Sequence, residues 1–348
     1  MSYEVKEISQ LEREVVFSVS WEEFDKSMQK QLVHLKQTVA IDGFRKGKVP
    51  DEILLKKYTE TLQDQAIKDI SLRCWSDYLA SNKNIVLATQ PMYNPKLDIK
   101  NKILSIDYFY ELSPEINLLS LESLEITKFE YSINQSDFTS MKEKVIKEHG
   151  NDQSQIAFEK LGFIGDDAEQ KFDLAIKQTL LQEVEFKLFQ KNKESILEAL
   201  LNEFQFSLPP SILAKAITTE ERRLGHELHE KAGHTHKAEE PCDKHVELDS
   251  FTKTLIEKRL KSDWILKHIV NNFNIIPKQE VIKKLISQTA QSTQDPEKAI
   301  RQLVQNDYWR NYFFTIALEI EFVDHIFNRV KIVSKPVKLS DLIDTNNK

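Results

Sequence analysis

The sequence predicts an α+β domain at the N-terminus, formed by an antiparallel sheet with two helices, and an extended all-α domain after it. The first observation behind this fold class is that the period of the apolar residues changes from two to helical spacing and back within residues 1–112. The second is that apolar spacing is helical almost throughout after residue 150. The third is the scarcity of chain-bending residues, 7 Gly and 10 Pro in 348, which argues against Rossmann sheets, propellers and Gly-cornered barrels.

The N-terminal elements follow one another with clear boundaries. Alternating apolar residues predict a strand over 11–19, and Ser20 followed by Glu23 is a capping-box pattern that opens a helix ending near Gly43. Pro50 suits the first turn of the next helix, whose apolar stripe continues to Leu79. Two further strands are expected over 84–97 and 103–112, joined by a polar turn. We therefore predict a β-α-α-β-β domain over residues 1–112.

The rest of the chain divides at residue 150. Residues 113–150 form a predicted connector, with an extended stretch at 124–129 and a short helix at 137–148. Residues 151–348 form the predicted helical domain. Its helices are separated by Pro, Gly or polar stretches and are expected over 158–161, 168–206, 212–231, 251–273, 278–289 and, as one final long helix, 296–329.

Composition excludes several classes of protein. The 48 basic and 55 acidic residues give a net charge of −7, which disfavours a generally basic nucleic-acid binder. No apolar run approaches the ~18 residues of a membrane-spanning helix. Cys74 and Cys242 lie far apart and fit a reducing compartment, and the first residues do not resemble a signal peptide. We therefore expect a cytoplasmic protein without a membrane partner.

The segment from Gly43 to Pro50 carries the most functional information. It reads Gly43-Phe44-Arg45-Lys46-Gly47-Lys48-Val49-Pro50, so two glycines bracket an aromatic and two cations, and a third cation follows. Residues 34–58 hold six Lys/Arg against three Asp/Glu, a local excess of positive charge on an acidic chain. Such a tip suits docking on an acidic surface such as ribosomal RNA. A solvated turn between helices is the simpler alternative, and a P-loop is excluded because the glycine spacing is one residue short and no Ser or Thr follows Lys48.

This segment, with Ile41 and Asp42 before it, resembles the ribosome-docking signature of trigger factor, the bacterial chaperone at the nascent-chain exit. Residues 108–116, 206–209 and the final helix also resemble parts of that family. The resemblance implies that Phe44, Arg45 and Lys46 make docking contacts, that Gly43 and Gly47 shape the loop, that Lys48 adds charge and that Pro50 starts the next helix. The implied partners are the large ribosomal subunit, through protein and rRNA near the exit tunnel, and nascent or unfolded polypeptides, with a homodimer off the ribosome as a further expectation.

One departure from the family is large. Trigger factors normally carry an FKBP-like prolyl isomerase domain between the two halves, at the place where this chain has the connector 113–150. Domains below about 40 residues rarely fold without staples, so the connector is too short for an isomerase barrel. We therefore expect no enzymatic activity and no cofactor.

A second cluster of chemistry-bearing residues lies between His226 and His245. His234, His236, Cys242 and His245 are candidate ligands for Zn²⁺ or Ni²⁺, but their spacing matches no closed structural zinc pattern. Gly233 and Pro241 predict a loop here, and a polar tip between two helices is the favoured interpretation.

The predicted function is therefore that of an ATP-independent chaperone that docks at the ribosomal exit tunnel, shields nascent chains and assists folding and export. The final helix is compatible with it, because residues 308–327 are apolar on more than one face, so part of the helix must be buried or offered to a partner. Core packing accounts for most of these residues, and the chaperone hypothesis needs only a minority of them to line an open cavity. Two alternatives stay open. One is a ribosome-independent holdase or assembly chaperone, and the other is an enzyme, either a prolyl isomerase or a metal-dependent protein that uses the His-rich loop.

Overall fold

The computed structural model describes residues 2–132, 134–150, 153–231, 246–291, 293 and 295–342. The chain packs as two compact units. Unit 1 comprises residues 1–115 and 206–257, and unit 2 comprises residues 116–205 and 258–348. The division of the chain into domains at residues 112 and 150 stays a prediction. In the structure, the predicted connector packs with unit 2 from Ile116 onward.

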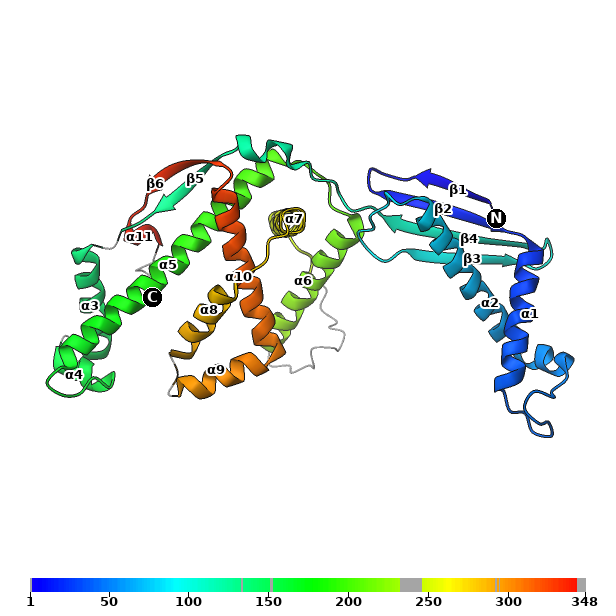
Figure 1. Ribbon diagram of the computed structural model, residues 1–348, viewed down its shortest axis with the longest axis horizontal. Coiled ribbons are helices and arrows are strands. Elements are labelled where there is room, and N and C mark those ends of the chain that lie inside the picture. The colour runs from blue at the N-terminus through cyan, green and yellow to red at the C-terminus, as the bar shows by residue number, and fades with distance from the viewer. Residues whose placement is uncertain are drawn as a thin grey trace. The chain divides into compact units, whose positions relative to one another are not determined.

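Unit 1 is built on a four-stranded antiparallel sheet (Figure 1). The strands lie in the order β1-β2-β4-β3, with bounds β1 Ser2–Glu7, β2 Glu12–Val19, β3 Met92–Asp98 and β4 Ile103–Glu111. Val15 of β2 faces Tyr108 of β4, which in turn faces Tyr93 of β3. The expected antiparallel pair of β3 and β4 is confirmed, but β1 was not predicted from the sequence. All six residues of β1 are exposed, so apolar and polar residues along it do not mark a buried and a solvent-facing side.

Two helices, α1 (Trp21–Thr38) and α2 (Asp51–Ser81), cover one face of this sheet. Ser20 caps α1, as its hydroxyl accepts a hydrogen bond from the Glu23 amide at 3.3 Å. The core between α2 and the sheet is rich in aromatic rings: Trp75 of α2 stacks on Tyr108 at a centroid distance of 4.8 Å, and Tyr93 stacks on the same ring at 5.5 Å. Aromatic pairs in such offset arrangements add to the free energy gained by burying their surface.

The later part of unit 1 is helical. Helix α6 (Pro210–Lys231) begins beside the end of β4, where the buried carboxylate of Glu111 accepts hydrogen bonds from the amide of Ser211 at 2.8 Å and from its hydroxyl. The carboxylate thus satisfies an amide at a helix N-terminus, where negative charge is favourable. Helix α7 (Ser250–Asn272) starts in unit 1 and continues into unit 2.

Unit 2 is arranged along α5 (Ala168–Glu203), a helix of 36 residues. A short 3₁₀ turn, η1 (Leu118–Ser123), leads into β5 (Glu125–Glu130), which pairs in parallel with β6 (Lys331–Pro336). The two-stranded sheet corrects the expectation of an all-α domain. The residues of β6 pair with those of β5, which lies about two hundred positions earlier in the sequence. Every residue of β6 is exposed, so no local apolar pattern indicates this strand.

The free edge of β5 is covered by polar side chains of α5. Asn192, which is buried, accepts a hydrogen bond from the Phe129 amide at 2.7 Å and donates one to the Phe129 carbonyl at 3.1 Å. Ser195 donates to the Thr127 carbonyl at 2.8 Å. Asn192 therefore takes the place of a neighbouring strand, and partly buried backbone groups that would cost free energy if unpaired are satisfied.

The remaining helices of unit 2 are α3 (Gln135–Gly150), α4 (Ser154–Lys160), α8 (Gln279–Gln291), α9 (Pro296–Gln305), α10 (Asp307–Phe327) and α11 (Leu339–Leu342). The single final helix expected over 296–329 is wrong, because it is divided at Asn306. The Asn306 backbone is extended, and its side chain accepts from the amides of Tyr308 and Trp309, so this residue caps a new helix. Among the described residues, no helix is long and apolar enough to span a membrane.

Candidate functional site

The predicted docking segment forms the connection between α1 and α2 and consists of two successive tight turns. The Phe44 amide donates to the Ile41 carbonyl at 3.0 Å, and the Lys48 amide donates to the Arg45 carbonyl at 2.9 Å. Gly43 and Gly47 each occupy the third position of a turn, with φ of +86° and +78°. Type II turns need a positive φ at that position, which glycine adopts at no steric cost.

The base of this docking loop is tied to both helices. The Gly47 amide donates to the Lys36 carbonyl near the end of α1 at 3.0 Å. The Lys36 ammonium group lies 2.6 Å from a carboxylate oxygen of Asp51, the first residue of α2. Val49 is fully buried. The loop is therefore fixed at its base by backbone, ionic and apolar contacts, in addition to the hydrogen bonds of its two turns.

The tip exposes the side chains expected to make contacts. Phe44 is 40% exposed, and Arg45, Lys46 and Lys48 are all exposed. Within the part of the chain that the structure describes, none of these three cations forms an ion pair. An exposed ring beside unpaired cations suits stacking and phosphate contacts with RNA, or ion pairs with acidic protein residues.

Pro50 was expected in the first turn of α2, but it lies one position before the first helical residue. Its backbone is extended, and its carbonyl accepts from the amides of Ile53 and Leu54, so it is the N-cap and Asp51 begins the helix. Helix α2 is also distorted at Tyr58, whose φ of −125° is not helical. Lys36 and Val49 were not predicted as part of the site, because the end of a helix stripe and one apolar residue in a polar loop give no signal on their own.

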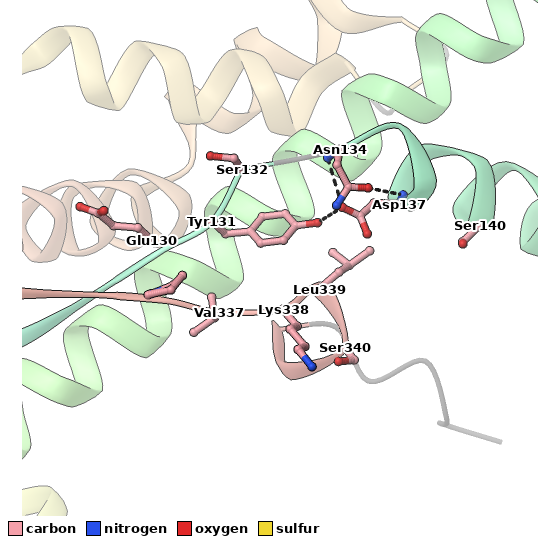
Figure 2. A pocket seen from close by; sticks show the side chains of 11 residues that line it. Glu130, Tyr131, Ser132, Asn134, Asp137, Ser140, Val337, Lys338, Leu339 and Ser340 are labelled. Carbon is pink, nitrogen blue, oxygen red and sulfur yellow. Dashed lines mark hydrogen bonds between the residues drawn. The ribbon is translucent and has the colours of Figure 1, made fainter.

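A second candidate site is a pocket of about 710 Å³ in unit 2, where β5 and β6 end beside the start of α3 (Figure 2). Asn134 and Asp137 cap α3 reciprocally, at 3.0 Å and 3.2 Å, and the Tyr131 hydroxyl donates to the Asp137 carboxylate. Burial, followed by that hydrogen bond, raises the pKa of Tyr131. A phenol held protonated and a carboxylate occupied with capping explain the local fold, and they form no pair of nucleophile and base.

The aromatic residues of α10 fall into a buried group and an exposed group. Phe313, Phe322 and Phe327 of α10 are buried. Three other aromatic residues of the same helix are exposed: Tyr308, Tyr312 and Phe314. Further exposed apolar side chains lie on α5, namely Leu174, Leu181 and Phe186.

The metal-ligand candidates His234, His236, Cys242 and His245 lie outside the described residues. Among the residues that are described, no group of three or more His, Cys, Asp or Glu side chains is placed to hold a metal ion. The other cysteine, Cys74, is a buried residue of α2, and desolvation raises the pKa of its thiol to about 11. Cys74 is therefore a core residue and not a reactive thiol.

Comparison with known proteins identifies the family. The family model described as bacterial trigger factor protein (TF) matches residues 1–145, and the model of the bacterial trigger factor protein (TF) C-terminus matches residues 167–328. The trigger factor of Psychromonas ingrahamii is 20% identical over 95% of this chain and 96% of its own length. The trigger factor of Hamiltonella defensa is 30% identical over 141 residues, which are 40% of this chain and 32% of that protein.

A solved structure reported under "Promiscuous Substrate Recognition in Folding and Assembly Activities of the Trigger Factor Chaperone" shares the fold, with a TM-score of 0.55 and 14% identity over 93% of this chain and 99% of that one. The alignment with the Psychromonas protein has 427 positions against 348 residues here, so at least 79 positions are filled by the relative alone. The two matched ranges leave only residues 146–166 between them. The chain therefore belongs to the trigger factor family and lacks the family's middle, FKBP-like region.

Proposed function

We propose that this chaperone docks on the ribosome through residues 43–50 and holds emerging polypeptides with the exposed apolar side chains of unit 2, without nucleotide. Membership of the trigger factor family supports the chaperone role. The observation that carries the docking proposal is the loop itself, a fixed double turn that exposes Phe44 and three unpaired cations on a chain with a net charge of −7. The proposal places the protein in the bacterial cytoplasm.

The client-holding part of the proposal rests on scattered apolar exposure. Tyr308, Tyr312 and Phe314 on α10 are each at least 45% exposed, and α5 adds Leu174, Leu181 and Phe186. Single exposed apolar residues are ordinary, but several on the helices of one unit offer many weak contacts. Each contact contributes little free energy, so binding is multivalent, fast and reversible, and a client can leave without a nucleotide-driven step.

Docking can be tested by pelleting vacant ribosomes through sucrose with the wild-type protein and with a Phe44→Ala/Arg45→Ala/Lys46→Ala variant. The control is Ile99→Ala/Lys100→Ala/Lys102→Asn, which removes one exposed apolar residue and two cations from the β3–β4 turn of the same unit. Lys102 has a φ of +53°, so Asn, which tolerates that conformation, replaces it. We expect the control to pellet like the wild type and the docking variant to stay in the supernatant.

Salt gives a second readout of the same contacts. If all three cations meet phosphates, the affinity falls about 20- to 40-fold between 50 and 200 mM salt. Wild-type protein that remains in the supernatant at low salt contradicts docking and favours the ribosome-independent holdase. Binding that survives in the docking variant with the same salt dependence shows that another surface makes the contact.

A further inference from the structure

The turn between α7 and α8, residues 273–278, is joined to α10 at two points. The first is ionic, because the Lys278 ammonium group lies 2.8 Å from a carboxylate oxygen of Glu321. The second is aromatic, because the centroid of the Phe273 ring lies 4.8 Å from that of the His325 imidazole. Glu321 and His325 are four positions apart on α10, so both lie on one side of that helix. The α7–α8 turn is therefore held against one side of α10.

The backbone at the end of α7 fixes Phe273. The Phe273 amide donates to the Ile269 carbonyl at 3.0 Å, and the Ile275 amide donates to the Val270 carbonyl at 3.0 Å. Asn274, between them, has a φ of +49°, which asparagine tolerates. These bonds form a Schellman motif, in which one residue of positive φ closes the helix. The position of the Phe273 ring is thus set by the way α7 ends.

The His325 imidazole places one of its nitrogens in the interior. Its Nε2 atom is buried and has no hydrogen-bond partner within the described part of the chain. A neutral imidazole can leave this nitrogen as an unprotonated acceptor, whereas the imidazolium carries a proton on both nitrogens. Protonation would therefore bury an N–H donor without an acceptor, which costs free energy. The geometry of the contact favours the neutral ring.

Arg329, just after α10, brings a positive charge to the same contact. Its guanidinium carbon lies 4.4 Å from the centroid of the Phe273 ring, so this ring has both a cation and the imidazole as neighbours. Burial, followed by the charge of Arg329, lowers the pKa of His325. A protonated His325 would place a second cation beside the ring that Arg329 already contacts, and like charges at one place disfavour the charged form.

Other charged groups around this contact come from α10, η1, the α7–α8 turn, α8 and β5. They are Glu321, Asp324, Glu122, Lys278, Glu280 and Lys128. Glu321 is already paired with Lys278. Burial, followed by the charge of Glu321, raises the pKa of Asp324, so this carboxyl takes up a proton early as the pH falls. Within the described residues, no carboxylate forms an ion pair with His325 that would stabilise its charged form.

We propose that His325 is an acid-sensitive contact, and that protonation of its imidazole weakens the packing of the α7–α8 turn on α10. The unfolded chain, in which a histidine has its usual pKa of 6.5, takes up this proton before the folded chain does. The stability that the contact contributes is therefore full at neutral pH and above, and it declines as the pH falls through about 6.5. The device belongs to the packing of unit 2, and it depends on neither ribosome docking nor client holding.

The test measures hydrogen exchange in the full chain between pH 7.5 and 5.5, expressed as protection factors so that the intrinsic pH dependence of exchange is removed. The reporter is the Ile275 amide at the end of α7. Its matched control is the Phe163 amide, which makes the same kind of bond, to the Phe158 carbonyl, at the end of α4. We expect the protection of Ile275 to fall by up to about tenfold per pH unit below 6.5, because the opened contact binds one more proton. Phe163 is expected to keep its protection, and an equal fall at both amides overturns the proposal.

Substitutions assign the effect to His325. His325→Phe keeps a ring beside Phe273 that cannot be protonated, so we expect the pH dependence at Ile275 to disappear. The control is His149→Phe, at an exposed position of α3 in the same unit, and it is expected to leave the pH dependence unchanged. Asp324 acts in the opposite sense to His325, since its raised pKa makes the folded chain take up a proton first. Its titration therefore cannot produce the expected loss of protection.

Titration of the wild-type imidazole by NMR gives a readout that needs no variant, and it decides the question if His325→Phe does not fold. The expected midpoint for His325 lies below 6.5. A midpoint at or above 6.5, a pH-independent protection of Ile275 in the wild type, or a pH dependence that persists undiminished in His325→Phe overturns the proposal.

Discussion

Gly43 shows how one residue governs the docking loop. Its φ of +86° lies where only glycine is free of strain, and nothing within 4 Å would collide with an added Cβ. Any cost of a side chain here is therefore conformational and not steric. The same holds for Gly47, with a φ of +78°.

We expect Gly43→Ala to weaken ribosome binding several-fold with only a small change in thermal midpoint, because about 1 kcal/mol of backbone strain shifts the loop away from its docking conformation. Gly43→Asn is the matched control, since asparagine tolerates positive φ. The measurement is the ribosome dissociation constant of each variant. Equal affinities for the Ala and Asn variants would show that the conformation of Gly43 is not what docking requires.

Cys74 gives a prediction about the core of unit 1. Burial raises its pKa from the usual 9.0 to about 11, so folding favours the protonated thiol. The stability associated with this group is full below pH 9 and declines as the pH rises toward 11, because the unfolded chain releases the proton first. In a Cys242→Ser variant, a thiol reagent at pH 8 is expected to react only as the protein unfolds in denaturant. Rapid reaction of the native protein would refute the buried, inert thiol.

The candidate docking residues could be picked out from the sequence because their signal is local. Two glycines four positions apart bracket Arg45 and Lys46, and both adopt the positive φ that type II turns require at their third position. The supporting contacts were not predictable in the same way. The Lys36–Asp51 pair joins two helices, and the burial of Val49 depends on how those helices pack.

At the scale of whole elements, one side chain of α5 takes the place of a strand beside β5. The buried amide of Asn192 satisfies both backbone groups of Phe129. Because β6 pairs with the other edge of β5, Asn192 alone provides the hydrogen bonds that a second neighbouring strand would give to Phe129.

We expect Asn192→Leu to destabilise unit 2 by about 1–3 kcal/mol, because it leaves the partly buried amide and carbonyl of Phe129 unpaired. Hydrogen exchange at the Phe129 amide is the direct measurement and should accelerate strongly. Asn202→Leu is the control, an exposed asparagine on the same helix. Unchanged exchange at Phe129 in the Asn192 variant would contradict the hydrogen bonds between Asn192 and Phe129.

The two strands that the sequence pattern missed, β1 and β6, share a physical cause. The period of a strand is visible only when one of its faces is buried, and both β1 and β6 are exposed along their whole length. The division between α9 and α10 was missed for another reason. Asn306 breaks the helix through a side-chain cap without Pro or Gly, and asparagine is too common inside helices for its presence to mark a boundary.

At the scale of the whole molecule, the chain joins the two matched regions of trigger factor through only 21 residues, 146–166. In this stretch the structure describes the end of α3, the helix α4 and residues 161–166, and their apolar side chains pack on α5. Among the described residues of this stretch, the structure has helix and turn and no strand.

We therefore expect no acceleration of a proline-limited refolding reaction by this protein. The measurement is the slow refolding phase of a protein whose folding waits on prolyl isomerisation, with a free isomerase as the positive control. A rate that increases in proportion to the concentration of this protein would show a catalytic site that the family comparison does not indicate.

The central claim is that docking and holding reside in different parts of one chain and act together on a nascent polypeptide. The most direct test measures protease digestion of a nascent chain on stalled ribosomes, with wild-type protein, the Phe44→Ala/Arg45→Ala/Lys46→Ala variant and the β3–β4 turn control. Suppression of aggregation of a free unfolded protein is measured in parallel. We expect the wild type and the control to slow digestion, and the docking variant to lose that protection while it still suppresses aggregation. Equal protection of the nascent chain by the docking variant would contradict the claim.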